Sequence, residues 1–267
     1  MVGAGSLGVR CPSPLVYPGG KSRILRALLR HIPSSLTELV SPFVGGGALE
    51  LTLARVGVRV IAYDAWEHLV CFWTEFLRHP SAVAAHVRRH APVVGKKTYL
   101  RFRDELRRGP DFEIPAIERA ARFYIVNRCC FRGLTRRGGC AKSAALARRQ
   151  VIEQLATAVA PPTMTVECAT FEQSIPRHPE AFLFCDPPYV ASEGVYPGSG
   201  QRFDHQALAT LLLGRNGPWM LTYGDCPLVR GLYDVPGVRM IPIVYRGHTR
   251  ASQRGGRRDL VLVRGPQ

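Results

Sequence analysis

The stretch that decides the fold is Ala181-Phe182-Leu183-Phe184-Cys185, followed at once by Asp186-Pro187-Pro188-Tyr189. A short, continuous apolar run predicts a strand that is buried on both faces, as in a parallel α/β sheet. Ligands of such sheets bind just beyond the carboxyl ends of the strands, where the last four residues would lie. We therefore expect the functional site at this point of the chain.

The residue types that follow the strand suit a planar ring bearing an amino group. The two prolines fix φ and have no N–H, so their carbonyls can be held toward a ligand. Asp186 can accept hydrogen bonds from an amine, and Tyr189 offers a flat face for stacking. An ordinary turn is the alternative, because Asp-Pro pairs are frequent in turns.

Strands and helices alternate along most of the chain, which predicts a doubly wound, mostly parallel sheet. A helix is expected over residues 66–77, and another begins at Asp204 and stops at Gly214. The last two expected strands have no helix between them and should form an antiparallel edge pair. The expected strands are 38–43, 58–63, 164–168, 181–185, 218–223, 238–245 and 259–264.

Two glycine-rich loops each precede an expected helix. Tyr17-Pro18-Gly19-Gly20-Lys21 leads into the first helix, whose N-terminal N–H groups suit a polar or anionic group. This loop is not a Walker loop, and a plain capped helix start explains it equally well. Val44-Gly45-Gly46-Gly47 follows the first strand, and consecutive glycines let the backbone approach a ligand closely. The dinucleotide pattern is missing, which disfavours NAD.

Asp64 stands at the end of the second expected strand, about 20 residues past the glycine turn. An acid at this distance can hydrogen-bond the hydroxyl pair of a ribose. The alternative is a helix N-cap for the helix from Trp66 onward, and the two roles are compatible.

The charge of the chain points to a polyanionic partner. With 36 Lys and Arg against 20 Asp and Glu, the net charge is +16, and the pI is near 10.1. Residues 119–149 contain nine Lys or Arg and no acid, and residues 239–258 contain six Arg and no acid. Such clustering favours nucleic acid as the partner over an evenly basic surface, which is the alternative.

The composition also predicts how the chain is divided. We expect a loose tail over residues 1–13, a catalytic domain formed by 14–79 and 150–267, and an insert over 80–149. The insert is expected to be basic and loop-rich, with helices at 82–90 and 114–127. Residues 127–136 mix donors, an aromatic residue and a glycine, which suits contact with a nucleic-acid backbone or base.

No window approaches 18 apolar residues, and the eight cysteines show no Cys-x-x-Cys spacing. These features predict no metal site, no membrane contact and a reducing, cytoplasmic location.

Five motifs together resemble the D12-class, Dam-like adenine-specific DNA methyltransferases of the alpha group. The resemblance runs from Leu15 to about Val263 and is weakest between Pro80 and Ile114. In order, the motifs are Tyr17-Pro18-Gly19-Gly20-Lys21, Ser41-Pro42-Phe43-Val44-Gly45-Gly46-Gly47-Ala48, Asp64, the segment from Asn127 to Arg136, and Asp186-Pro187-Pro188-Tyr189.

The resemblance implies transfer of a methyl group from S-adenosylmethionine to adenine N6 in double-stranded DNA. It implies a Rossmann-like methyltransferase sheet with an inserted, mainly helical target-recognition region. A partner restriction endonuclease and a monomer or weak dimer are further expectations. It assigns catalysis to Asp186, Pro187, Pro188 and Tyr189; cofactor binding to Tyr17, Gly20, Lys21, Phe43, Gly45, Asp64, Phe171 and Asp186; and nucleic-acid binding to Asn127, Arg128, Arg132, Arg136 and Arg137.

This chain departs from the pattern of the family at several points. Thr170 precedes Phe171 where the family often has an acid, and Arg132 stands where a small or amide residue is common. The residues after Arg136 are too few for the longer base-reading hairpin of Dam. Methylation of cytosine N4 or of RNA adenine, and a catalytically inactive nucleic-acid-binding relative, are the alternatives.

Overall fold

The computed structural model describes residues 13–91, 95–135, 138–140, 149–190, 203–245 and 257–265. The expected tail over residues 1–13 therefore lies outside the described residues, apart from Ser13.

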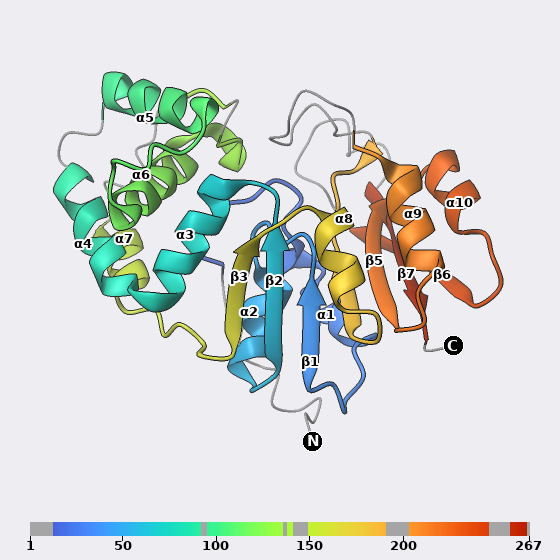
Figure 1. Cartoon of the computed structure of the whole chain (residues 1–267). Coiled ribbons are helices and arrows are strands. Elements are labelled where there is room, and N and C mark those ends of the chain that lie inside the picture. Colours follow the sequence, from blue (N-terminus) through green and yellow to red (C-terminus); the bar gives the residue numbers. More distant parts are fainter. Residues whose placement is uncertain are drawn as a thin grey trace.

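The described residues form a seven-stranded sheet with the strand order β3-β2-β1-β4-β5-β7-β6 (Figure 1). Five neighbouring strands are parallel, and they are β1 (Glu38–Ser41), β2 (Arg59–Asp64), β3 (Met164–Cys168), β4 (Phe182–Cys185) and β5 (Trp219–Gly224). β7 (Arg257–Arg264) runs antiparallel to both β5 and β6 (Val238–Tyr245). The predicted sheet and its antiparallel edge pair are confirmed. All four residues of β4 are buried, as the apolar run predicts.

The strand order reverses between β1 and β4, which is where ligands of open α/β sheets bind. The glycine turn follows β1 and Asp186 follows β4, so the reversal brings these two segments side by side at the carboxyl edge of the sheet.

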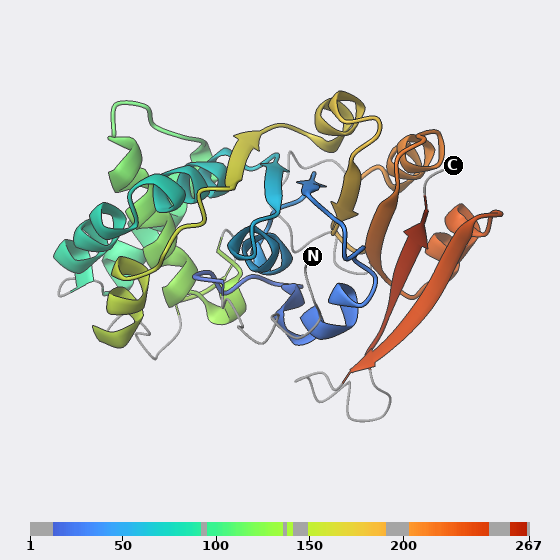
Figure 2. The same ribbon diagram turned by 90° about the horizontal axis from the view of Figure 1, so that it is seen from below.

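Helices cover both faces of the sheet, as seen from below in Figure 2. α1 (Leu25–Leu29), which follows the short helix η1 (Lys21–Arg23), and α2 (Ala48–Arg55) lie on one face. α8 (Phe171–Ser174), which continues into η5 (Ile175–Arg177), and α9 (His205–Leu213) lie on the other.

The expected start of α9 is confirmed, because Asp204 Oδ1 accepts a hydrogen bond from the Ala207 N–H at 2.8 Å. A further helix, α10 (Pro227–Tyr233), lies between β5 and β6 and was not expected from the sequence.

The described part of the insert is mainly helical, as the family resemblance implied, and less loop-rich than its composition suggested. After α3 (Glu67–Arg78), the described part of the insert contains α4 (Pro80–His90), α5 (Lys96–Arg108), α6 (Ala116–Cys129), η3 (Phe131–Gly133) and the start of α7 (Arg149–Ala156). The loop-rich expectation is wrong for α5, whose charged sequence hides buried Tyr99, Phe102 and Leu106 at helical spacing.

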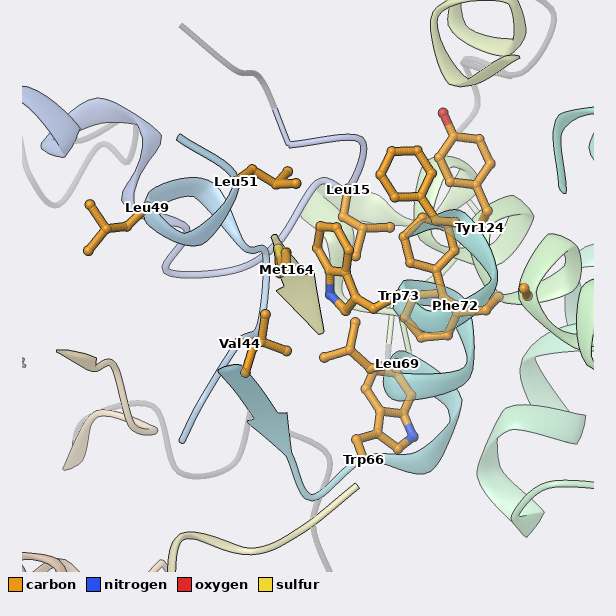
Figure 3. Packing of buried hydrophobic residues seen from close by; sticks show 14 of the residues in the cluster. Leu15, Val44, Leu49, Leu51, Trp66, Leu69, Phe72, Trp73, Tyr124 and Met164 are labelled. Carbon is orange, nitrogen blue, oxygen red and sulfur yellow. The ribbon is translucent and has the colours of Figure 1, made fainter. Parts of the chain in front are cut away.

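The helices of the insert share a core with the sheet (Figure 3). Phe72 of α3 stacks on Phe123 and Tyr124 of α6, with ring centroids 5.6 and 5.8 Å apart. The insert is therefore attached to the sheet through α3, beside the β3 edge (Figure 1). Among the helices described, none combines the length and the apolar character needed to cross a bilayer.

Candidate active site

Asp186, the first residue after β4, is held from two directions at the carboxyl edge. The Lys21 ammonium in η1 lies 2.5 Å from Oδ1, and the Thr222 hydroxyl on β5 donates to the same oxygen at 2.8 Å. Lys21 also donates to the Gly19 carbonyl oxygen at 2.7 Å. The motifs around Lys21 and Asp186, distant in sequence, therefore meet in one site.

Burial and the partners of Asp186 have opposite effects on the pKa of its carboxyl group. Burial raises the pKa of its carboxyl, and the neighbouring Asp259 acts in the same direction. The Lys21 ammonium and the Thr222 hydroxyl oppose that rise, because both stabilise the ionised form. The Asp186 side chain is still 21% exposed, so a substrate group can reach it.

A second buried carboxyl group, Glu50 of α2, lies within electrostatic range of both Asp186 and Lys21. Glu50 is 2% exposed and its Oε1 accepts a hydrogen bond from the Ser41 hydroxyl at 2.7 Å. Burial raises the pKa of Glu50 to about 7, and the charge of Asp186 adds to the rise. Sequence reasoning missed Glu50, although an acid in the otherwise apolar run after the glycine turn was a signal for it.

Tyr189, which was expected to stack on a ligand ring, is a buried residue. The residue is 4% exposed, and its hydroxyl donates to Asp259 Oδ2 of β7 at 3.2 Å. The Lys21 ammonium lies over the ring, 5.0 Å from its centroid. A Cβ on Gly224 would come within 3.2 Å of the ring, so the ring also packs closely against the end of β5. Asp259 is a further residue that sequence reasoning missed.

Pro187 and Pro188 lie between Asp186 and Tyr189. Pro187 is buried and Pro188 is half-buried, so the turn after β4 is packed into the protein. The rigid turn and the buried Tyr189 together fix the backbone on both sides of the Pro187 carbonyl.

The end of β2 forms the second half of the site. Asp64 Oδ2 accepts from the Gly45 N–H at 3.2 Å, and Oδ1 accepts from the Trp66 N–H at 3.0 Å. Burial raises the pKa of Asp64 to about 6, against the effect of these hydrogen bonds. Each carboxylate oxygen can accept more than one hydrogen bond, so Asp64 can still receive hydroxyl donors. The N-cap of α3 is Trp66, and no side chain caps it, so the expected helix-cap role of Asp64 is wrong. Asp64 instead holds the turn before the helix, and its ribose role stays a prediction.

Neighbouring side chains leave little room for a Cβ atom at the glycines after β1. A Cβ on Gly45 or Gly46 would lie 3.1 or 2.9 Å from Tyr17, and one on Gly47 would lie 2.8 Å from Trp73. Gly47 also has a φ of 62°, which disfavours other residues. Tyr17 thus lies over the glycine turn, while the turn from Tyr17 to Gly20, closed by a 3.0 Å hydrogen bond, delivers Lys21.

An aromatic cluster lies beside the same edge of the sheet. The ring centroids of Phe43, Phe171 and Phe203 lie 5.2 to 5.8 Å apart. The Thr170 departure has a structural explanation here, because Thr170 and Gln173 form a capping box at the start of α8. Thr170 therefore stabilises the N-terminal end of α8.

The family model of the D12 class N6 adenine-specific DNA methyltransferases matches residues 17–248, which include every residue of this site except Asp259. The chain belongs to this family. It is an S-adenosylmethionine-dependent DNA adenine N6-methyltransferase by that membership.

Several relatives resemble the chain over most of its length. It is 23% identical to the type II methyltransferase M1.LlaDCHI of Lactococcus lactis subsp. cremoris, covering 92% of this chain and 93% of that one. It is 24% identical to the type II methyltransferase M.CviBI of Paramecium bursaria Chlorella virus NC1A, covering 83% and 86%. A DNA N-6-adenine-methyltransferase of Escherichia phage P1 is 28% identical over 86% of this chain, but the match spans only 32% of that longer protein.

Among solved structures, a SAM-dependent methyltransferase from Agrobacterium tumefaciens aligns with a TM-score of 0.39 at 15% identity, covering 91% of this chain and 60% of that one. This likeness is too distant to carry a further conclusion.

The residues of this methyltransferase fit an adenosine-bearing cofactor. Asp64 offers acceptors for ribose hydroxyls, and the aromatic cluster offers an apolar surface for a ring. The assignment of the cofactor site to Tyr17, Gly20, Lys21, Phe43, Gly45, Asp64, Phe171 and Asp186 stays a prediction.

The structure gives Asn127 a role different from the expected contact with nucleic acid. Asn127 is 0% exposed, its Oδ1 accepts from the Val16 N–H at 3.0 Å, and its Nδ2 donates to the Val16 carbonyl oxygen at 2.8 Å. The same Nδ2 donates to the Thr135 hydroxyl at 3.0 Å. Because the amide is buried and engaged on both sides, Asn127 ties the insert to the segment before Tyr17.

The other residues expected to bind nucleic acid are only partly visible. Arg128 is half-buried and donates to the Pro14 carbonyl oxygen at 3.5 Å. Arg136 and Arg137 lie outside the described residues, as does the side chain of Arg132. Their contact with nucleic acid stays a prediction.

Proposed function

We propose that this enzyme transfers the methyl group of S-adenosylmethionine directly to the N6 amine of an adenine that is flipped out of double-stranded DNA. The observation that carries the proposal is the partly exposed Asp186 carboxylate, held at the carboxyl edge of the sheet by Lys21 and Thr222. Asp186 and the Pro187 carbonyl would accept the two hydrogen bonds that the amine can donate.

Asp186 addresses the main difficulty of the reaction. The bound cofactor supplies a methyl group already activated on a sulfonium. The N6 lone pair is delocalised into the adenine ring, so the amine is a poor nucleophile. Hydrogen bonds from both N–H groups to Asp186 and the Pro187 carbonyl favour the pyramidal amine and stabilise the positive charge that develops on it. No covalent intermediate with the enzyme is needed, so positioning and electrostatics carry the rate.

The charges around Asp186 support the same chemistry. Glu50 and Asp259 are buried and lie within electrostatic range of the partly exposed Asp186, whose carboxylate is paired with Lys21. Carboxyl groups around the site favour a guest that becomes positively charged over one that stays neutral.

The adenine must leave the duplex to reach this site, since the edge of a stacked base is inaccessible. We assign the stacking of the flipped ring to Tyr189. Lys21 lies over the Tyr189 ring in this structure, so the base has to displace the ammonium from that face. The Tyr189 hydroxyl, bound to Asp259, has a supporting role, so Tyr189→Phe should keep most activity and Tyr189→Ala should lose much of it.

The test is incubation of the enzyme with labelled S-adenosylmethionine and unmethylated double-stranded DNA, followed by separation of the nucleosides. We expect the label in N6-methyladenine. Label in N4-methylcytosine, or in RNA offered in parallel, would replace the proposal by the corresponding alternative. No label together with intact cofactor binding would point to an inactive relative.

We also propose a biological setting for the enzyme. Two relatives are type II methyltransferases by name, which supports action beside a cognate restriction endonuclease. A monomer or weak dimer is a separate proposal from the sequence. The described cysteines are free thiols, which supports a reducing compartment such as the cytoplasm. Titration of purified enzyme against its DNA by analytical ultracentrifugation tests the oligomeric state.

A further inference from the structure

We infer that Thr222 is a positioning residue for methyl transfer: its hydroxyl fixes the Asp186 carboxylate through Oδ1, so that Oδ2 is the oxygen presented to the amine of the substrate. The inference rests on the role proposed above for Asp186. Both contacts that the described residues make with this carboxylate, from Lys21 and from Thr222, fall on Oδ1.

Thr222 is built into the rigid part of the fold. It lies on β5, next to β4, and Leu221 is in register with Cys185, which places Thr222 beside Asp186. On the other side Thr222 is paired with Val261 of β7. The residue is 0% exposed, so its position is set by two neighbouring strands.

The hydroxyl is the unusual feature of this position. Thr222 follows Trp219, Met220 and Leu221 in a strand whose first five residues are all buried, where valine would fill the same volume without a polar group. A buried hydroxyl needs an acceptor, and the Cys185 carbonyl oxygen lies 3.4 Å away. The shorter contact, at 2.8 Å, is to the carboxylate, and hydrogen bonds to charged groups are the stronger ones.

Lys21 and Thr222 differ in what happens when the base enters. Lys21 lies over the Tyr189 ring, where the adenine is proposed to stack, so its ammonium has to move. Thr222 belongs to the sheet and keeps its place. Thr222 is therefore the contact that keeps the carboxylate oriented while Lys21 moves.

The same contact also affects the pH at which Asp186 is ionised, together with burial and Lys21. The charged groups around Asp186 are the Lys21 ammonium, Glu50 of α2 and Asp259 of β7, the last of which accepts from Tyr189. The neutral Cys185 and Tyr223 also lie close by. A donor to a carboxylate favours the ionised form, so removal of the Thr222 hydroxyl must raise the pKa of Asp186.

The test compares Thr222→Val, which keeps the shape and removes the hydroxyl, with Thr222→Ser, which keeps the hydroxyl. Single-turnover methylation is measured against pH for both, together with cofactor affinity by calorimetry and DNA affinity. We expect Thr222→Val to slow the transfer about 10- to 100-fold, as for loss of one hydrogen bond to a charged group. The acid limb of its pH profile should move to higher pH, with both affinities near those of the parent. Thr222→Ser should restore the rate and the limb.

Two results would overturn the inference. One is a Thr222→Val enzyme whose transfer rate and acid limb match the parent, and the other is a Thr222→Ser enzyme as slow as Thr222→Val, since the methyl group would then be the important part. Asp186→Ala, assayed in parallel, separates this inference from the proposed function. If Asp186→Ala is inactive while Thr222→Val is normal, only the positioning role falls; if Asp186→Ala transfers at the parent rate, both fall.

Discussion

Two groups of charged side chains, one at the sheet edge and one in the insert, differ in how the charges of their carboxyl groups are stabilised. At the sheet edge, Lys21 pairs with Asp186, and the carboxyl groups of Glu50 and Asp259 lie within electrostatic range of Asp186. In the insert, Glu118 of α6 accepts from His86 and His90 of α4 and from Arg122, at 2.7 to 2.9 Å. Arg122 also donates to Glu105 of α5 at 2.9 Å.

The difference distinguishes a network that stabilises the structure from a group that takes part in the reaction. The network around Glu118 joins three helices, and its acids and bases satisfy one another, so it holds the insert together. At the sheet edge, burial raises the pKa of Asp186, that of Glu50 to about 7 and that of Asp64 to about 6, so ionisation of these carboxyl groups costs stability. Such raised pKa values are typical of a functional site.

The largest contrast is expected from Asp186→Ala. Loss of the carboxylate removes the acceptor that acts on the amine as charge develops, so turnover should fall about a thousandfold or more. DNA binding should largely persist, because phosphate contacts dominate it. Initial rates and filter-binding affinities of the same preparation provide the measurement. Some loss of cofactor affinity is compatible with the assignment, but near-parental methylation is not.

Glu118→Gln should do the reverse, with a loss of stability that leaves the chemistry intact. Burial alone would raise the pKa of Glu118, but hydrogen bonds from His86, Arg122 and His90 lower it to about 2. A carboxyl whose pKa is lowered in the folded state stabilises the protein above its unfolded pKa of about 4.5, and that contribution disappears as the pH falls toward 2.

The Glu118 side chain is 15% exposed, so a cost of about 2 kcal/mol at neutral pH is expected, between surface and buried pairs. Urea unfolding from pH 7 to pH 3 should show a shallower acid loss in Glu118→Gln than in the parent. Identical pH dependence of the two proteins would show that the network does not support the insert.

Asp64→Ala tests the second half of the sheet edge. Loss of its carboxylate should weaken cofactor binding by about 1.5–3 kcal/mol, the value of hydrogen bonds to a charged group. Calorimetric titration with the cofactor provides the number. Unchanged affinity would remove Asp64 from the cofactor site and leave it as the partner of Gly45 and Trp66 only.

Glu50→Gln sharpens the charge argument at the sheet edge. A carboxyl whose pKa is raised to about 7 makes the folded protein less stable as the pH rises from about 4.5 to 7, because the buried group must then ionise. Glutamine keeps an acceptor for Ser41 and removes that loss, which is about 3 kcal/mol at most. Melting curves from pH 5 to pH 8 should therefore be flatter for Glu50→Gln. A steeper decline would contradict the raised pKa.

The smallest effect is expected from Arg136→Ala combined with Arg137→Ala in the insert. If both contact phosphates, the slope of log affinity against log salt should fall by about 0.9 for each. Binding measured from 50 to 200 mM salt, on specific and unrelated DNA, tests the prediction. Should the slope and the site preference both survive, the recognition surface lies elsewhere, and residues 246–258 are the next candidates.

The elements with a strong apolar pattern could be predicted from the sequence. The run 181–185 and the alternation around it were sufficient for the sheet and its antiparallel edge. α5 was missed because Arg and Lys dominate it, and only three buried side chains mark its inner face. Helix α10, which is short and begins at a proline, offers little periodicity.

The site was predictable where residues belong to a motif and unpredictable where they meet through the fold. Lys21 and Asp186 were named from the sequence, but their ion pair depends on the order of β1, β4 and β5. Thr222, Glu50 and Asp259 lie in apolar strands or helices and contact the site only because those elements are adjacent. Asn127 was misassigned because an amide within an Arg-rich segment suggests a ligand, whereas its partner Val16 is 111 residues away.

The Asn127 contact limits how recognition regions can be exchanged between relatives. A chimaera that replaces residues 80–149 alone would remove the buried amide that binds the backbone of Val16, which directly precedes the motif of Lys21. The transplantable unit therefore includes residues 13–17 together with the insert, although the two are far apart in the sequence. The segments that can be exchanged together are therefore defined by hydrogen bonds between them, and not by the boundaries of the insertion in the sequence.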